Sequence, residues 1–381
     1  MGLEELRQRI DAADSRLVEA FKERMQVSAE IGKYKLEHGI PVVDPKRERE
    51  VLNKIVAMAD EPELSSYYRV LYSLLFELSR SYQNKLNKTN DEAFSQIAEA
   101  IENTPKMFPK TARVACQGVE GAYSTIACEK LFKSPDIMYL GNFEGVFKAV
   151  ETGMCEYGIL PIENSTAGSV RKVYDLMLSH HFYIVRGTRI KINHCLIAAS
   201  GTELNQIKEI YSHEQALNQC SEFLRSLGSD VKIVEVENTA IAASMVAQSG
   251  RSDVAAISSH RCAELYGLKS IASNIQDNGN NHTRFICISR KPEIFPGASK
   301  TSIMMILSHR PGALYKMLAR FYALDINVVK LESRPIPDRD FEFMFYFDIE
   351  TSVYSEEFVQ LIRELSDGTE EFYYLGSYNE V

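Results

Sequence analysis

Three cations fall on one face of the helix predicted over residues 3–38. At alternating steps of three and four residues, this face carries Arg7, Arg24 and Lys35 between apolar residues such as Leu17. Surface helices normally separate charged from apolar side chains, and an unpaired buried cation is costly. Snorkelling of a long side chain would explain one such cation. Three on one face favour a buried site for an anion.

Helical geometry limits which of these cations can share one ligand. At about 1.5 Å of rise per residue, Arg24 and Lys35 lie roughly 16 Å apart, and Arg7 lies about 26 Å from Arg24. Only the first pair can bend toward one small dianion, and an antiparallel second copy of the chain could supply Arg7. A cage of fixed cations can hold carboxylates and stabilise negative charge that develops on an oxygen.

Two further predicted helices offer polar side chains to the same site. The second begins at a proline directly after Asp44, which is suited to be its N-cap, and it turns Arg47 and Glu48 inward. On the third helix, Ser79 and Gln83 are one turn apart and therefore share a face.

A second set of polar residues lies between residues 112 and 292. Thr283 and Arg284 stand directly before the apolar run that begins at Phe285. A turn before an edge strand would explain Thr283 and Arg284 taken alone. Other predicted strand ends and the loops after them also carry polar residues: Ser124, Glu163, Asn164, Ser165, Ser212, Gln215 and Gln219. Ligands of open α/β sheets bind at the carboxyl ends of the strands, and helix N-termini there favour an anion.

A third set lies near the end of the chain, where "RPGAL" opens a helix and "ESRP" closes a strand. A turn would explain the residues of "RPGAL". A strand end explains the four residues of "ESRP" less well. The two stretches contain Gly312, Ala313 and Leu314, and Glu332, Ser333, Arg334 and Pro335.

The periodicity of the sequence predicts several domains that position these sets. Strands alternating with helices after residue 112 imply βαβ units and a parallel sheet. The order βαββαβ near the end fits a small ferredoxin-like domain. The predicted divisions are an all-helical domain over 1–88, a linker over 89–111, a two-lobed α/β domain over 112–292 and an α+β domain over 299–376.

Composition excludes several classes of protein. The chain has 381 residues and a formal charge of −9, which argues against a general nucleic-acid binder. Its 7 cysteines form no CxxC pair, so a disulfide framework or zinc site is not expected. No GxGxxG fingerprint, signal peptide or membrane-spanning run is present. The sequence predicts a soluble, cytoplasmic protein without metal or cofactor.

The N-terminal stretches "LEELRQRIDAADSRLVEAFKERMQVSAEIGKYK", "DPKREREVL" and "SRSYQ" resemble the all-helical chorismate mutases of the shikimate pathway. The resemblance implies that cations grip the two carboxylates and the ether oxygen of chorismate: Arg7 from a partner chain, Arg24, Lys35 and Arg47. It implies that Gln83 and Glu48 contact the ether oxygen and the ring hydroxyl, with Asp44 and Ser79 in support. A Claisen rearrangement needs a held conformer and charge stabilisation rather than a nucleophile.

The stretches "GVEGAYS", "PIENSTAGS", "SHEQALNQ" and "NHTRF" resemble the prephenate dehydratases. This implies two α/β lobes like those of a periplasmic binding protein. It also implies that Thr283 assists departure of the ring hydroxyl and that Arg284 binds a carboxylate. The other polar residues of this set, together with Phe285, would shape the substrate site. The family often has proline at the position of Glu214.

The last domain resembles the ACT regulatory module, which implies a phenylalanine site between paired domains at "RPGAL" and "ESRP". Taken together, the resemblances imply the bifunctional chorismate mutase–prephenate dehydratase family, acting as a homodimer or larger homo-oligomer. The small-molecule partners would be chorismate, prephenate and phenylalanine, with no nucleic acid or membrane. Two alternatives stay open: a ligand-sensing regulator, which would leave Thr283 without a purpose, and a dehydratase whose N-terminal helices are only structural.

Overall fold

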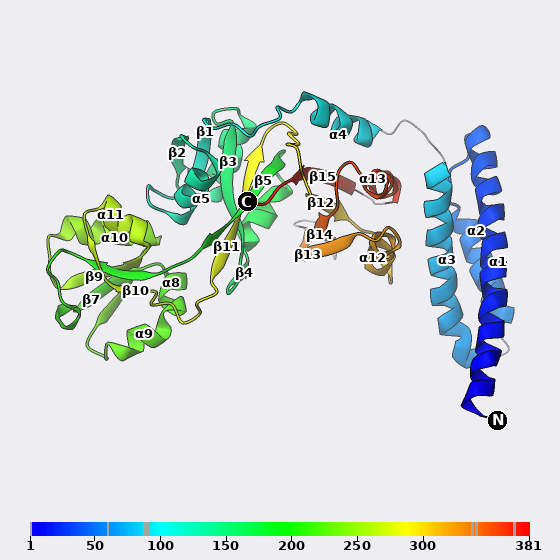
Figure 1. The fold of residues 1–381 in the computed structure, drawn as a ribbon, viewed down its shortest axis with the longest axis horizontal. Helices are drawn as coiled ribbons and strands as arrows, with labels where there is room; N and C mark the ends of the chain where they lie inside the picture. The colour runs from blue at the N-terminus through cyan, green and yellow to red at the C-terminus, as the bar shows by residue number, and fades with distance from the viewer. Residues whose placement is uncertain (1, 59–60, 87–91, 337–338, 340–341, 369–370) are drawn as a thin grey trace. The chain divides into compact units, whose positions relative to one another are not determined.

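The structure is a computed structural model that describes residues 2–58, 61–86, 92–336, 339, 342–368 and 371–381 (Figure 1). The chain forms two compact units. The first combines Met1–Glu99 with Ile303–Tyr373, and the second combines Ala100–Ser302 with Tyr374–Val381.

Three helices predicted at the N-terminus are present in the first unit: α1 (Leu3–Glu37), α2 (Pro45–Met58) and α3 (Ser65–Leu86), with a 3-10 turn over Pro62–Leu64 before α3. Asp44 caps α2 as predicted, because its Oδ1 accepts the backbone N–H of Arg47 at 3.0 Å. Glu4 and Glu5 in the first turn of α1 and Lys35 in its last turn complement the helix dipole. Helix α4 (Glu92–Asn103) lies within the predicted linker.

The second unit holds two sheets, which form separate lobes in Figure 1. One has the order β2-β1-β3-β11-β5, and its strands are Asp136–Leu140, Arg113–Gln117, Tyr157–Asn164, His282–Ser289 and Tyr183–Lys191, with β4 (Gly168–Ser169) paired to β3. The other has the order β10-β6-β9-β7-β8, and its strands are Lys269–Ser273, Cys195–Ala198, Val254–Ser258, Glu209–Ser212 and Lys232–Glu235.

Helices cover both sheets. Three pack on the first sheet: α5 (Tyr123–Leu131), α6 (Phe143–Glu151) and α7 (Arg171–Met177). Four accompany the second sheet: α8 (Glu214–Gln219), α9 (Ser221–Ser226), α10 (Thr239–Ser249) and α11 (His260–Leu265). Strand residues such as Ile159, Phe285 and Ile197 are fully or almost fully buried beneath them.

The expected parallel pairing is present, but the sheets are mixed. Strand β1 runs parallel to β2 and β3, but β11 is antiparallel to both of its neighbours, β3 and β5. The reason is the chain path, since β5 leads out of the first sheet into β6 and β11 returns from β10. Residues 192–194 and 274–281 make these two crossings. They are tied together by hydrogen bonds from Ile192 N to Asn281 O (2.8 Å) and from Ile275 N to His194 O (3.1 Å).

A third sheet has the order β13-β14-β12-β15. Its strands are Asn327–Pro335, Phe343–Glu350, Lys300–Ile306 and Glu371–Tyr378, and its helices are α12 (Ala313–Ala323) and α13 (Glu356–Gly368). Along the chain these elements follow the predicted order, β12-α12-β13-β14-α13-β15. Among the described residues, no helix is both long and apolar enough to cross a membrane.

Candidate active sites

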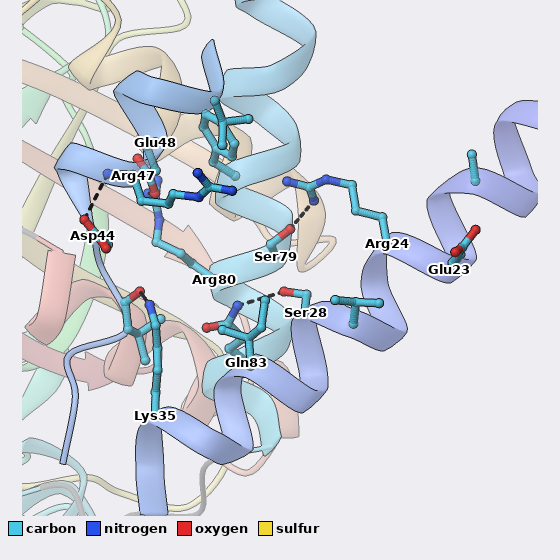
Figure 2. Close-up of a pocket in the computed structure, with 16 residues that line it drawn as sticks. Glu23, Arg24, Ser28, Lys35, Asp44, Arg47, Glu48, Ser79, Arg80 and Gln83 are labelled. Carbon is cyan, nitrogen blue, oxygen red and sulfur yellow. Dashed lines mark hydrogen bonds and ion pairs between the residues drawn. The ribbon is translucent and has the colours of Figure 1, made fainter. Parts of the chain in front are cut away.

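A pocket of about 530 Å³ lies between α1, α2 and α3 (Figure 2). Seven of the eight residues predicted for this site line it: Arg24, Lys35, Asp44, Arg47, Glu48, Ser79 and Gln83. Apolar residues such as Ile31, Val51 and Phe76 complete the wall. The pocket therefore combines cations with an apolar surface, which suits a small organic anion.

The cations enter this pocket from different elements. Figure 2 shows the guanidinium groups of Arg24 on α1 and Arg47 on α2 pointing toward one another across it. Arg24 Nη1 donates to Ser79 Oγ and, at 3.2 Å, to Leu75 O. Burial lowers the pKa of Arg24, yet an arginine stays protonated in proteins. Lys35 Nζ donates to Val42 O at 2.7 Å at the other end of the pocket.

Gln83 is placed by a close approach of two helices. Its Nε2 donates to Ser28 Oγ at 2.8 Å, and its buried Oε1 has no partner among the described residues. A Cβ on Gly32 would lie 2.9 Å from Gln83 Cγ, so only glycine lets α3 come this close to α1.

Arg80 was missed by the sequence analysis, although it lines the pocket. Its guanidinium forms ion pairs with Glu48 and Glu77. A signal was available, because Arg80 lies three residues after Glu77 and three before Gln83, which is the spacing of neighbours on a helix face.

Arg7 does not reach this pocket from its own chain. Its side chain is 64% exposed and lies 3.6 Å from Glu4, consistent with the distance along α1 derived above. Its supply by a second copy stays a prediction.

In the second unit, Asn164 and Thr283 meet at the ends of two paired strands. Asn164 Nδ2 donates to Thr283 Oγ1 at 2.9 Å and to Asn281 Oδ1 at 2.8 Å. Asn164 Oδ1 accepts from the backbone N–H groups of Thr166 and Ala167, at 3.1 and 2.9 Å. The amide is thus fully used, and it fixes the threonine hydroxyl relative to the strand.

Gln219 joins this group from the other lobe. Its Nε2 donates to Thr166 Oγ1 at 3.1 Å, and its Oε1 accepts from Asn281 Nδ2 at 3.0 Å and lies 2.9 Å from His194 Nε2. Burial lowers the pKa of His194, so its ring is neutral near pH 7 and donates through Nε2. The sequence analysis missed Asn281 and His194, although Asn281 directly precedes "HTRF".

Arg284 is paired with a carboxylate of its own chain, and its binding of a substrate carboxylate stays a prediction. Arg284 is 6% exposed, and its Nε donates to Glu380 Oε2 at 2.8 Å and its Nη2 to Tyr378 Oη at 2.7 Å. Neighbouring residues of a strand point to opposite faces, which explains why the two side chains separate. The partner Glu380 lies 96 residues later, beyond the reach of any local pattern.

Other residues predicted for this site have structural partners. Phe285 is 3% exposed in the core of the first sheet. Ser124 Oγ donates to Gln117 O at 2.6 Å, and the fully buried Ser212 Oγ donates to Ile257 O at 2.7 Å. Neither of these two hydrogen bonds involves Asn164 or Thr283, and the place of the three residues in a substrate site stays a prediction.

Three remaining residues lie at loops and strand ends. Ser165 Oγ donates to Asn280 O and accepts from His282 N, both at 2.9 Å, so it fastens the loop before β11. Glu163 is paired with Arg284 in the strand register. Gln215 is exposed and lies at the start of α8.

The predicted effector residues lie on α12 and β13. Gly312 is the N-cap of α12 with φ +82°, a conformation that favours glycine, and Ala313 and Leu314 follow in the first turn. The residues Glu332, Ser333, Arg334 and Pro335 end β13, an edge strand whose exposure alternates along its length.

Comparison with known proteins gives matches over both units. The family model for chorismate mutase type II matches residues 6–84, and that for prephenate dehydratase matches residues 114–293. The bifunctional chorismate mutase/prephenate dehydratase of Escherichia coli (strain K12) is 32% identical, over 98% of this chain and 95% of that protein.

Two further relatives match about three quarters of the chain. The arogenate dehydratase/prephenate dehydratase 2 of Arabidopsis thaliana is 37% identical, over 74% of this chain and 76% of that protein. A prephenate dehydratase from Arthrobacter aurescens, solved in complex with L-Phe, is 26% identical with a TM-score of 0.63, and the match covers 71% of this chain and 90% of that one. With both catalytic domains matched and a relative of the same length aligned end to end, the chain belongs to the family of bifunctional chorismate mutase/prephenate dehydratases, the enzymes of phenylalanine biosynthesis.

Proposed function

We propose that the pocket between α1, α2 and α3 binds chorismate and rearranges it to prephenate. Arg24, Arg47 and Lys35 hold the carboxylates and the ether oxygen, and Arg7 from a second copy completes the cage. Gln83 and Glu48 contact the ether oxygen and the ring hydroxyl, with Asp44 and Ser79 in support. The rearrangement is intramolecular, so a fixed geometry and fixed positive charge lower its barrier without proton transfer.

Prephenate then loses water and carbon dioxide at the Asn164–Thr283 group to give phenylpyruvate. Thr283 Oγ1 accepts a hydrogen bond from Asn164, which leaves its own proton available for the departing ring hydroxyl. Aromatisation drives the step. Gln219 closes the group from the other lobe, and closure would exclude water. Glu163, Ser165 and Gln215 remain candidates for shaping the site.

Phenylalanine is proposed to inhibit the dehydratase from a separate effector site. The domain over 299–376 would be an ACT domain with a ferredoxin-like fold, and Gly312–Leu314 with Glu332–Pro335 would bind the amino acid between paired copies. The L-Phe complex of the Arthrobacter relative supports this ligand. The edge position of β13 leaves a strand open to pairing in a dimer.

The remaining proposals concern organisation. The catalytic domains would span 1–88 and 112–292 with a linker over 89–111, and the enzyme would act in the cytoplasm as a dimer or larger homo-oligomer.

One observation carries the mutase assignment: seven predicted polar side chains, six from three helices and Asp44 from the N-cap of α2, line a single pocket. The decisive assay gives purified protein chorismate and follows prephenate and phenylpyruvate together, with and without phenylalanine. Appearance of both products supports the bifunctional enzyme. Conversion of added prephenate without any use of chorismate would leave the helices a structural role.

A further inference from the structure

A buried carboxylate lies behind the chorismate pocket. Glu77 on α3 is 4% exposed and does not line the pocket. One of its oxygens, Oε1, accepts from Arg80, whose other contact is Glu48 inside the pocket. A buried carboxylate is stable only when it is paired and hydrogen-bonded, so the partners of Glu77 determine where Arg80 and Glu48 lie.

The second oxygen of Glu77 is held by α12, a helix more than 200 residues later in the chain. Arg320 Nη2 and Nε donate to Glu77 Oε2 at 3.1 and 3.2 Å. The Arg320 side chain is 14% exposed, and its Nη1 also donates to Glu364 O on α13 at 3.1 Å. Arg320 is therefore itself fixed from two sides.

A second contact fastens the same face of α3. Ser81 Oγ donates to Glu364 Oε1 at 2.6 Å, and Gln360 Nε2 lies 2.9 Å from Ser81 Oγ. Both partners belong to α13. The helix that supplies Ser79, Arg80 and Gln83 to the pocket is thus held from behind by two helices of the third sheet.

The charges along this path alternate in sign. Arg320, Glu77, Arg80 and Glu48 form three ion pairs in sequence, and their formal charges sum to zero. Removing an outer charge leaves Glu77 to compete with Glu48 for Arg80, because a buried carboxylate that has lost one partner binds the remaining one more strongly. The orientation of Glu48 then changes although no pocket residue has been altered.

We propose that Glu77 and Arg320 are positioning residues for the chorismate mutase reaction, acting through Arg80 on Glu48. The inference rests on the mutase function proposed for the pocket. It assigns to α12 a part in the mutase site that lies outside the helical domain itself.

The test compares both activities of the full chain in Arg320→Gln and wild type. We expect kcat/KM for chorismate to fall about 10-fold, since couplings within such networks amount to factors of a few to about a hundred. The loss should appear mainly in KM, because the hydrogen bond that the ring hydroxyl donates to Glu48 exists in both the substrate and the transition state. Dehydration of added prephenate should stay within about 2-fold of wild type, which also reports correct folding.

Three further variants separate positioning from a general effect. Arg320→Lys keeps the charge and should recover most of the mutase activity. Lys316→Gln removes the same charge from the same helix, but its Nζ lies 3.9 Å from Glu77 and its side chain is 44% exposed, so a small effect is expected. In an Arg80→Gln background, adding Arg320→Gln should lower mutase kcat/KM little further, because the ion pairs that connect Arg320 to Glu48 are already broken.

The outcomes are distinct from those of the main assay. If wild type does not convert chorismate, the proposed mutase function fails. If wild type is active and Arg320→Gln has the same kcat/KM for chorismate, the positioning role is overturned. It is also overturned if the double variant loses the full product of the two single-variant losses in kcat/KM. If Arg320→Gln loses both activities, the charge-conserving Arg320→Lys decides, and failure to recover mutase turnover there also overturns the proposal.

Discussion

At the scale of single residues, the two candidate active sites present different chemical groups. The helical pocket presents several fixed cations and holds charge in place. The Asn164–Thr283 group presents a neutral hydroxyl oriented by an amide, with a neutral His194 nearby through Gln219. The first arrangement suits a rearrangement and the second suits loss of a hydroxyl. The two reactions should therefore respond to different substitutions.

Arg24→Ala and Thr283→Val should separate the two activities. Arg24→Ala removes a partly buried cation that contacts Ser79, so mutase turnover should fall by roughly 100-fold or more, as for loss of a preorganised donor. Dehydration of added prephenate should be unchanged. Thr283→Val keeps the shape of the side chain but removes its hydroxyl, and the reverse pattern is expected. Steady-state assays of both variants on both substrates provide the measurement, and loss of both activities in either folded variant would contradict two independent sites.

At the scale of elements, the position of each helix in the pocket depends on close packing. Gly32→Ala tests this on α1, where a Cβ would lie 2.9 Å from Gln83 Cγ and 3.1 Å from Gln83 Cβ. Helix propensity alone favours alanine by about 1 kcal/mol. A fall of about 10-fold in mutase kcat/KM would therefore reflect displacement of Gln83, an effect expected when catalytic geometry shifts slightly. Gly141→Ala is the control, since a Cβ there meets no atom within 4 Å; equal behaviour of the two variants would disprove the packing argument.

Glu380 holds strand β11 through Arg284, whose side chain points to the opposite face of the strand from Thr283. This carboxylate pairs with Arg284, Lys300 and Arg189. Burial would raise the pKa of Glu380, but the three cations outweigh burial and lower it. A lowered carboxyl pKa stabilises the fold above the ordinary value and loses that stabilisation as the pH falls through the lowered pKa. The group therefore stays charged near neutral pH and fixes the strand that carries Thr283.

Glu380→Gln should consequently loosen β11 and impair the dehydratase. Breaking a buried ion pair costs on the order of 3 kcal/mol, so thermal unfolding of the dehydratase unit should shift down by several degrees. Its kcat should fall while mutase activity is retained. Arg189→Gln is the matched control, because the Arg189 side chain is 62% exposed and exposed pairs contribute little. Normal dehydratase activity and an unchanged melting temperature in Glu380→Gln would show that Glu380 does not fix β11.

The sequence predicted these elements unequally. Apolar periodicity located α1 nearly to the residue, because this helix is long and strongly patterned. Periodicity could not give the pairing of the short strands β6 and β10, because β10 lies more than 70 residues after β6 in the chain. Spacing on α1 predicted that Arg24 and Lys35 share a face, and both line the pocket. Arg284 could not be placed in this way, since its partner Glu380 is distant in sequence and only the folded chain brings them together.

At the scale of the whole molecule, helix α1 leaves much apolar surface exposed in a single copy of the chain. Many of its large apolar side chains are between about one third and two thirds exposed, including Leu3, Ile10, Leu17 and Val18. Exposed apolar surface of this extent marks an interaction site. The same half of the helix carries Arg7, which the pocket of its own chain cannot use. A second copy of this chain would cover the surface and deliver the cation.

This arrangement predicts that inactive chains can restore one another. In a dimer of Arg7→Ala with Arg24→Ala, one site takes Arg7 from the Arg24→Ala chain and Arg24 from the Arg7→Ala chain, so it is intact, while the other lacks both. Random exchange of equal amounts makes half of the dimers hybrid, so about a quarter of all sites, and roughly a quarter of wild-type mutase activity, should return. Subunit exchange is followed by mass spectrometry of chains with different tags, and each variant alone serves as the baseline. If hybrids form in this proportion and mutase activity stays at the baseline, Arg7 does not act across subunits, and the cation cage must be completed within one chain.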